Sequence, residues 1–169
     1  MSTIGSHDAF VDLVDRHRGI LFKVAGAYCQ DPSDREDLIA EIVVALWRAH
    51  ARFDGRSSFA TWTYRIAVNV AIAFYRRDVR RRRDLVPVEE SILAAIAAPA
   101  EAAQDERLDF LRELIDRLEP LDRALMLLYL DEYPHGEIAA MLGISESNVG
   151  TKIGRIKERF RRTAAQRQP

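Results

Sequence analysis

Apolar residues recur every three or four positions along most of this chain, and this helical spacing is the feature that most limits its fold. Alternating apolar runs joined by hairpin turn pairs, which are typical of strands, are missing. With 169 residues, 48% of them hydrophobic and 30% charged, the chain has enough apolar material for a core. We therefore expect an all-α fold, and the composition excludes a wholly disordered or collagen-like chain.

Capping and turn signals divide the pattern into separate helices. The pair Asp31-Pro32 ends the first helix. Ser33, with Glu36 three positions later, has the spacing of a capping box, and Ser58 is a suitable cap for the third helix. The expected helices cover residues 8–29, 33–52 and 58–83, then 105–119, 120–132 and two short elements on either side of Gly143.

This division of the chain predicts two small helical domains joined by a flexible linker. The first domain is expected over 1–83 and the second over 105–169. Between them, residues 84–104 are acidic and rich in alanine, and Pro87 and Pro99 interrupt any helical stripe.

The net charge of −1 hides separate blocks of opposite charge. Residues 76–83 carry six arginines and one aspartate, and residues 152–167 carry seven basic residues and one glutamate. Residues 84–122 carry eleven acidic residues and three arginines. Basic blocks in a nearly neutral chain indicate local contact with a polyanion, although solvated helix ends are the alternative for either block alone.

Segment 135–160 has the spacing of a helix-turn-helix. Ala139 is small enough for a second helix to cross closely, Gly143 suits a left-handed turn, and Ser145 suits the next helix cap. The second helix should bury Val149, Ile153, Ile156 and Phe160 and turn outward Ser147, Asn148, Thr151, Lys152, Arg155 and Arg159. These outward groups suit base edges and phosphates, whereas an ordinary helical hairpin with a polar side is the alternative.

Segment 34–47 combines a buried stripe with an unusual outer side. The stripe is expected to hold Leu38, Ile39, Ile42, Val43, Leu46 and Trp47, and the outer side Asp34, Asp37, Glu41, Val44 and Arg48. An apolar residue in a charged strip resembles a docking surface for a basic partner helix. Acids in the first turn also interact favourably with the helix dipole, but that alternative leaves Glu41 and Val44 unexplained.

Segment 58–83 carries a polar line next to an aromatic loop. Its packed side is expected to hold Phe59, Trp62, Ile66, Val70, Ala73 and Phe74, and its polar line Thr61, Arg65, Asn69, Arg76 and Arg80. Hydrogen-bonding and cationic groups in one line suit a nucleic-acid backbone. Aromatic residues at or near the preceding loop, Phe53, Phe59, Trp62, Tyr64 and Tyr75, suit an unstacked base, although most are expected in the core.

The order of these segments resembles the extracytoplasmic-function sigma factors of bacteria. The resemblance rests on DREDLIAE (34–41), RFDGRSSFATWTYRIAVNVA (52–71), the arginine run, the acidic linker and LEPLDRALMLLYLDEYPHGEIAAMLGIS (118–145), followed by a basic helix. It covers nearly the whole chain. It implies that the first domain docks on the clamp helices of the beta-prime subunit of core RNA polymerase and opens the minus-ten promoter element. The second domain would read the minus-thirty-five element and contact the flap of the beta subunit, with the linker threading the polymerase.

The resemblance also implies roles for individual residues. Core-polymerase binding falls to Asp34, Asp37, Glu41, Val44 and Arg48. Minus-ten recognition falls to Arg56, Ser57, Ser58, Phe59, Thr61, Arg65, Asn69, Arg76 and Arg80. Minus-thirty-five recognition falls to Ser147, Asn148, Thr151, Lys152, Arg155, Arg159 and Arg162. The chain departs from the family pattern at Ala40, where glutamine is usual, at Pro134 and Gly136 in the first turn of the helix-turn-helix, and at Gly150, which offers no basic group.

Two other functions compete with this interpretation. A stand-alone helix-turn-helix regulator would bind its operator without polymerase, and the acidic docking helix argues against it. A helical metalloenzyme would need more ligands than Glu132 and His135, which are split by Pro134. We therefore expect no enzymatic activity, metal or cofactor.

The remaining expectations concern compartment and partners. The lone Cys29 and the lack of a signal-like or membrane-spanning stretch favour a cytoplasmic protein without membrane insertion. Promoter DNA and core polymerase are the expected partners. An anti-sigma factor is a common further partner in the family, although no residue identifies one.

Overall fold

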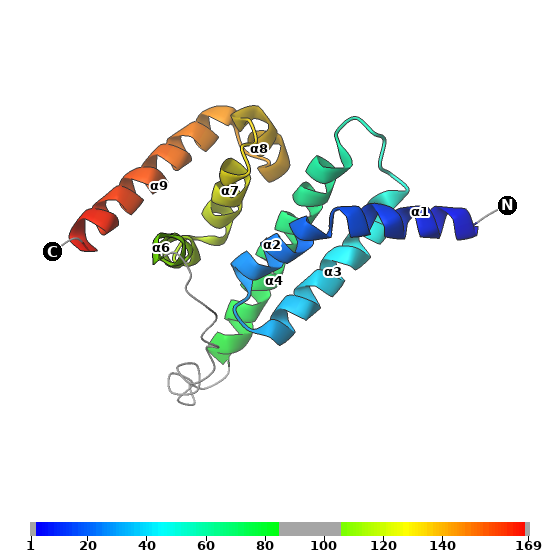
Figure 1. Cartoon of the computed structure of the whole chain (residues 1–169), viewed down its shortest axis with the longest axis horizontal. Helices are drawn as coiled ribbons and strands as arrows, with labels where there is room; N and C mark the ends of the chain where they lie inside the picture. Colours follow the sequence, from blue (N-terminus) through cyan, green and yellow to red (C-terminus); the bar gives the residue numbers. More distant parts are fainter. Residues whose placement is uncertain (1–2, 85–105, 168–169) are drawn as a thin grey trace.

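Two groups of helices make up the computed structural model, which describes residues 3–84 and 106–167 (Figure 1). The first helical unit contains α1 (Thr3–Arg16), α2 (Arg18–Tyr28), α3 (Pro32–His50) and α4 (Phe59–Asp84). The second helical unit contains α6 (Glu106–Asp116), α7 (Pro120–Leu130), α8 (His135–Leu142) and α9 (Glu146–Arg167). Neither described range holds a strand, so the predicted all-α class is confirmed. The linker expected over 84–104 falls, except for Asp84, outside the described residues.

The first helix is shorter than the sequence pattern predicts, because the chain breaks at His17. This residue has φ −110° and ψ 10°, and its backbone N–H donates to Val14 O at 3.1 Å. The Nδ1–H of its ring donates to Leu13 O at 2.8 Å, where a regular helix would place the backbone N–H. The prediction of one helix over 8–29 was therefore wrong, and a local side-chain bond to the backbone divides it.

The start of α3 also differs from the prediction. The Asp31 carboxylate accepts hydrogen bonds from the N–H groups of Ser33 at 2.8 Å and Asp34 at 3.2 Å. Asp31 is therefore the cap in place of Ser33, and Pro32 stands in the first turn, where its missing N–H costs no helical bond.

Helix α4 lies in the middle of the molecule and is covered on two sides. It contacts α2 and α3 within the first unit and α7 and α8 of the second unit (Figure 1). Its buried residues are accordingly Phe59, Thr63, Tyr64, Ala67, Val68, Ala71 and Ile72. Of the packed side predicted from the sequence, Phe59 is buried and Trp62, Ile66, Val70 and Phe74 are half-buried against the core, whereas the prediction was wrong for Ala73, which is exposed.

The second unit contains the predicted helix-turn-helix. Gly143 ends α8 in the left-handed conformation, with φ 69° and ψ 33°. Ser145 then caps α9, because its Oγ accepts the Asn148 N–H at 3.1 Å. Ala139 is buried, as are Val149, Ile153 and Ile156 on the inner face of α9. The local signals for this motif are thus confirmed.

No helix of the described ranges is both long and apolar enough to cross a lipid bilayer.

Two of the glycines in the helix-turn-helix segment, Gly154 and Gly143, are expected to have opposite effects on stability when each is replaced by alanine. A Cβ at Gly154, in the exposed middle of α9, would meet no atom within 4 Å, so Gly154→Ala should raise the free energy of unfolding by about 1 kcal/mol. At Gly143 the positive φ of 69° is a strained conformation for any residue with a side chain. Gly143→Ala should therefore lower the free energy of unfolding by about 1 kcal/mol. Urea denaturation followed by circular dichroism measures both. A shift of the same sign in the two variants would contradict these assignments.

Candidate functional site

The outer side of α3 forms a continuous strip, here called the α3 strip and made of Asp34, Asp37, Glu41, Val44 and Arg48. All of these residues are exposed except Asp34, which is half-buried. Val44 is 46% exposed although it is apolar. The strip therefore presents acids at its start, an exposed apolar residue in its second half and a cation at its end.

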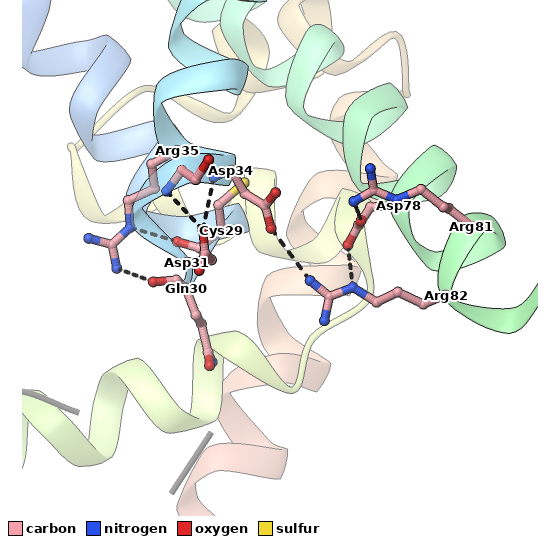
Figure 2. Close-up of polar contacts among 9 residues, drawn as sticks. Cys29, Gln30, Asp31, Asp34, Arg35, Asp78, Arg81 and Arg82 are labelled. Atoms are coloured by element: carbon pink, nitrogen blue, oxygen red, sulfur yellow. Dashed lines mark hydrogen bonds and ion pairs between the residues drawn. The ribbon is translucent and has the colours of Figure 1, made fainter. Parts of the chain in front are cut away.

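Two acids of the α3 strip are paired with arginines of α4. Arg77 lies 2.6 Å from the Glu41 carboxylate, and both groups are largely exposed. Figure 2 shows the Arg82 guanidinium between Asp34, at 3.5 Å, and Asp78, at 2.8 Å. The exposed Arg77–Glu41 pair contributes at most about 1 kcal/mol, so a partner can replace it at small cost.

Asp37 differs from Asp34 and Glu41, the other two acids of the α3 strip, because within the described ranges it has no ion-pair partner.

The Cys29 thiol lies near the start of the strip. Its burial, followed by the carboxylates of Asp34 and Asp78, raises the pKa of this thiol to about 11. The thiol consequently stays protonated at neutral pH.

These pairs separate the arginine run of α4 into two groups. Arg77 and Arg82 turn toward α3, and Arg81 pairs with Asp78 at 2.8 Å. Arg76 and Arg80 are exposed and form no ion pair with another described residue. Arg76 and Arg80, the two arginines of the predicted polar line, therefore remain available to a ligand.

Trp47 is placed differently from the prediction. It was expected in the buried stripe, but 43% of its surface is exposed. Its ring makes a T-shaped contact with Phe10 of α1, with the ring centroids 5.0 Å apart, and lies parallel to the His50 ring at a centroid distance of 6.3 Å. Trp47 therefore packs against α1 while part of its side chain stays in solvent. Trp47 follows Val44 by one helical turn and adds an aromatic surface to the α3 strip, which sequence reasoning missed because it assigned Trp47 to the core.

The loop before α4 is tightly ordered by its own side chains. The Asp54 carboxylate accepts from the backbone N–H and the Nε of Arg56, each at 3.1 Å, and Gly55 has φ 72°. Ser58 Oγ accepts the Thr61 N–H at 3.1 Å and thereby starts α4 as predicted. The Arg56 side chain is nevertheless 90% exposed, so the loop holds a cation out toward solvent.

The aromatic residues of this loop pack against one another. Phe53, Phe59 and Trp62 have ring centroids 5.1–5.6 Å apart, and Phe59 is buried. Phe59 therefore packs beneath the other two rings as part of the interior and has no ring face open to solvent. Trp62, in contrast, is half-buried.

A groove of about 490 Å³ lies between this loop and α8. Its lining comes from both helical units: Arg56, Ser57, Ser58, Thr61, Trp62 and Arg65 on one side, and Glu137, Ala140 and Met141 on the other. From the groove, Arg65, Asn69, Arg76 and Arg80 continue along α4, all exposed. The loop–α4 surface, defined as Arg56, Ser57, Ser58, Thr61, Arg65, Asn69, Arg76 and Arg80, is thus a polar and cationic track with the exposed Ala73 between Asn69 and Arg76.

The outer face of α9 is the second such surface. Ser147, Asn148, Thr151, Arg155 and Arg159 are exposed on it, and they are called the α9 face below. Lys152, expected to turn outward with them, instead forms a half-buried ion pair with Asp122 of α7 at 2.7 Å. Arg162 is exposed and bonded to Glu158 at 3.1 Å. The outward prediction was therefore wrong for Lys152, because an acid from another helix lies within its reach.

Comparisons with known proteins assign both units to one family. A family model described as Sigma-70 region 2 matches residues 13–82, and one described as Sigma-70, region 4 matches residues 110–160. The ECF RNA polymerase sigma-E factor of Escherichia coli (strain K12) is 30% identical over 164 residues, covering 91% of this chain and 85% of its own length. The chain belongs to the extracytoplasmic-function sigma factors.

Other similar proteins agree with this assignment. RNA polymerase sigma factor NccH of Alcaligenes xylosoxydans xylosoxydans is 27% identical over 92% of this chain and 87% of its own length. Among solved structures, RpoE from Bartonella quintana, in complex with the anti-sigma factor NepR, has the same fold, with a TM-score of 0.71, 17% identity and coverage of 95% and 99% of the two chains. CnrH in complex with the cytosolic domain of CnrY also has this fold, with a TM-score of 0.66 and 24% identity. The match covers 96% of this chain and 91% of CnrH.

Membership in this family decides between the functions considered from the sequence. An extracytoplasmic-function sigma factor directs core RNA polymerase to specific promoters and opens the minus-ten element for transcription initiation. The stand-alone regulator is not favoured, because both sigma regions are present in the order that such a factor requires.

Proposed function

We propose that the sigma factor binds core polymerase through the α3 strip. An exposed line of acids with Val44 and Trp47 beside them offers both charge and apolar area to a basic helical partner such as the clamp helices. Asp37 forms no ion pair within the described residues and can bind a basic group of the partner directly. Glu41 would replace its ion pair with Arg77 by one with a basic group of the partner. This exposed mixed strip is the observation that carries the proposal.

The loop–α4 surface is the proposed contact for the opened minus-ten element. Strand separation becomes easier when an extruded base gains a pocket and the released strand gains cationic partners, each stacked base contributing about 1–3 kcal/mol. The groove beside Trp62 provides space for such a base, and Arg56 and Arg65 stand at its rim. Arg76 and Arg80 extend the same track toward the backbone of the strand.

The α9 face is the proposed reader of the minus-thirty-five element. Asn148 and Arg155 bring amide and guanidinium groups suited to base edges in the major groove, and Arg159 and Arg162 suit the phosphates. Lys152 is assigned a supporting role through Asp122, since that ion pair holds α9 against α7.

The rest of the assignment concerns organisation and partners. Residues 1–83 would form the docking and melting domain, 105–169 the upstream reader that contacts the flap, and 84–104 the linker that threads the polymerase. The protein acts by binding, without catalysis or a cofactor, in the cytoplasm with its polymerase. A partner of the anti-sigma kind is supported by two similar structures, RpoE in complex with the anti-sigma factor NepR and CnrH in complex with the cytosolic domain of CnrY.

A gel shift with and without core polymerase tests this function. The purified chain alone should bind promoter duplex weakly, and core polymerase should create sequence-specific binding and opening of the minus-ten element. Binding of equal strength without core would contradict the proposal and favour the stand-alone regulator.

A further inference from the structure

The recognition helix α9 has a position without a side chain in its second turn, at Gly150. This residue is half-buried and directly precedes Thr151 of the α9 face. A Cβ placed on Gly150 would lie 3.8 Å from Nδ1 and 3.9 Å from Cε1 of His135. The His135 imidazole, from the first turn of α8, therefore lies against the place where a side chain of α9 would otherwise extend.

The imidazole of His135 is held by packing and keeps its polar atoms available. Its ring centroid lies 6.5 Å from that of Tyr129 of α7, and the residue is half-buried. Neither ring nitrogen forms a hydrogen bond or ion pair with another residue in the described part of the chain. Both nitrogens can therefore serve a ligand at the edge of the α9 face.

The place of His135 in the motif indicates what that ligand is. In a helix-turn-helix on DNA, the first turns of the second helix enter the major groove while the first helix crosses the phosphate backbone. His135 stands at the start of the first helix, α8, and beside the second turn of α9. A group at this junction faces the phosphates that border the groove, which require a donor or a cation.

Neighbouring acids suit a cationic form of this imidazole. Glu137 and Glu146 are exposed and stand in the first turns of α8 and α9. The Glu146 carboxylate would lie 3.7 Å from a Cβ placed on Gly136, the residue next to His135. An acid so near the backbone of DNA repels a phosphate, and a protonated imidazole offsets that repulsion.

Other groups act in the opposite direction. The positive end of the α8 dipole disfavours a cation at His135. Lys157 of α9 adds a positive charge on the same side of the helix, with its Nζ over the Tyr129 ring at 5.5 Å from the centroid. The ring is thus placed between opposing charges, and a phosphate adds one more negative charge in favour of the protonated form.

We propose that His135 is a further DNA-binding residue of the sigma factor: beside Gly150 its protonated imidazole binds a phosphate at the edge of the minus-thirty-five element, where α9 itself provides no side chain. The inference rests on the proposed role of the α9 face as reader of that element. Histidine changes charge between about pH 5 and 8. The phosphate favours the protonated ring, so the contact is present at low pH and is lost as the pH rises.

Holoenzyme binding to a duplex that carries the minus-thirty-five element and ends upstream of the minus-ten element tests the contact without strand opening. The duplex comes from a promoter located by transcription of genomic DNA with this sigma factor. His135→Ala should weaken binding about fivefold at about pH 6 and by less than about twofold at about pH 8. At the lower pH it should also reduce the salt dependence, log K against log salt, by about one. An equal loss at both pH values would show a purely structural role and overturn the proposal.

A lysine at position 150 provides a rescue, because a Cβ there would make only ordinary van der Waals contacts. Gly150→Lys combined with His135→Ala should restore binding at both pH values, since lysine stays charged throughout this range. Gly150→Met combined with His135→Ala adds an uncharged side chain of similar helix propensity and should restore nothing. Equal rescue by methionine and lysine would overturn the phosphate contact.

His7→Ala is the control for titration elsewhere, because His7 is exposed on α1. With core polymerase in excess, its pH profile should match that of the wild type, and circular dichroism should show unchanged helix content for His135→Ala. A profile as flat in His7→Ala as in His135→Ala would place the pH dependence outside the proposed contact and overturn it.

Arg155→Ala separates failure of this inference from failure of the proposed function. Arg155 is an exposed member of the α9 face. A loss of binding in Arg155→Ala with none in His135→Ala would show that the His135 contact alone is wrong. Wild-type binding in Arg155→Ala would show that the α9 face does not read the element, and the inference would fall with that assignment.

Discussion

Replacing Asp37 and Glu41 by lysine is expected to abolish binding of the sigma factor to core polymerase. The two acids lie on the exposed α3 strip, and reversing their charge sets like charges against a basic partner helix. Juxtaposed like charges cost several kcal/mol, so the dissociation constant should rise by at least about 100-fold. Pull-down and titration with core polymerase measure the loss, and transcription in vitro should fall with it.

Glu36→Lys is the matched control for this variant, because Glu36 is an exposed acid in the same turn of α3 but outside the strip. It should retain core binding. The double variant should keep its helical circular dichroism, since Glu41 loses only the exposed pair with Arg77. Unfolding of the double variant, or an equal loss in Glu36→Lys, would contradict the assignment of the strip.

Promoter opening is expected to fall by about tenfold to 100-fold in a variant with Arg56→Ala and Arg65→Ala. These two arginines flank the groove before α4, and under the proposed assignment their loss removes cationic contacts to the separated strand but leaves the proposed core and minus-thirty-five contacts in place. Fluorescence of 2-aminopurine in the minus-ten element measures opening, and filter binding measures promoter association.

Arg16→Ala provides the comparison, because Arg16 is an exposed cation of α1 that contributes to neither the groove nor the α3 strip. Its opening rate should match that of the wild type. Core binding should persist when Arg56 and Arg65 are replaced by alanine. If opening is unchanged in the double variant, the groove does not receive the strand.

Local signals explain why much of the fold was predictable. A glycine in a left-handed turn and a serine cap act within a few residues, so Gly143 and Ser145 identified the helix-turn-helix directly. The same locality limits precision, since Asp31 and Ser33 are both suitable caps and sequence alone does not rank them. The break at His17 depends on one ring-to-carbonyl bond that periodicity does not encode.

Partners that are distant in sequence explain what was not predictable. Lys152 fits the outward pattern of α9, but Asp122 lies beside it only once α7 has packed. Arg123 reads as an ordinary helix-surface cation, yet two tyrosines and Ala27 of the other unit enclose it. Exposed residues such as Asp37 and Val44 were easier to place, because their position depends mainly on the face of a single helix.

Transcription in vitro tests the central assignment most directly. Core polymerase, fragmented genomic DNA and nucleotides should yield discrete start sites when this sigma factor is added, each preceded by common minus-ten and minus-thirty-five sequences, and none of these starts with core alone. Initiation that is the same with and without the chain would contradict its role as a sigma factor.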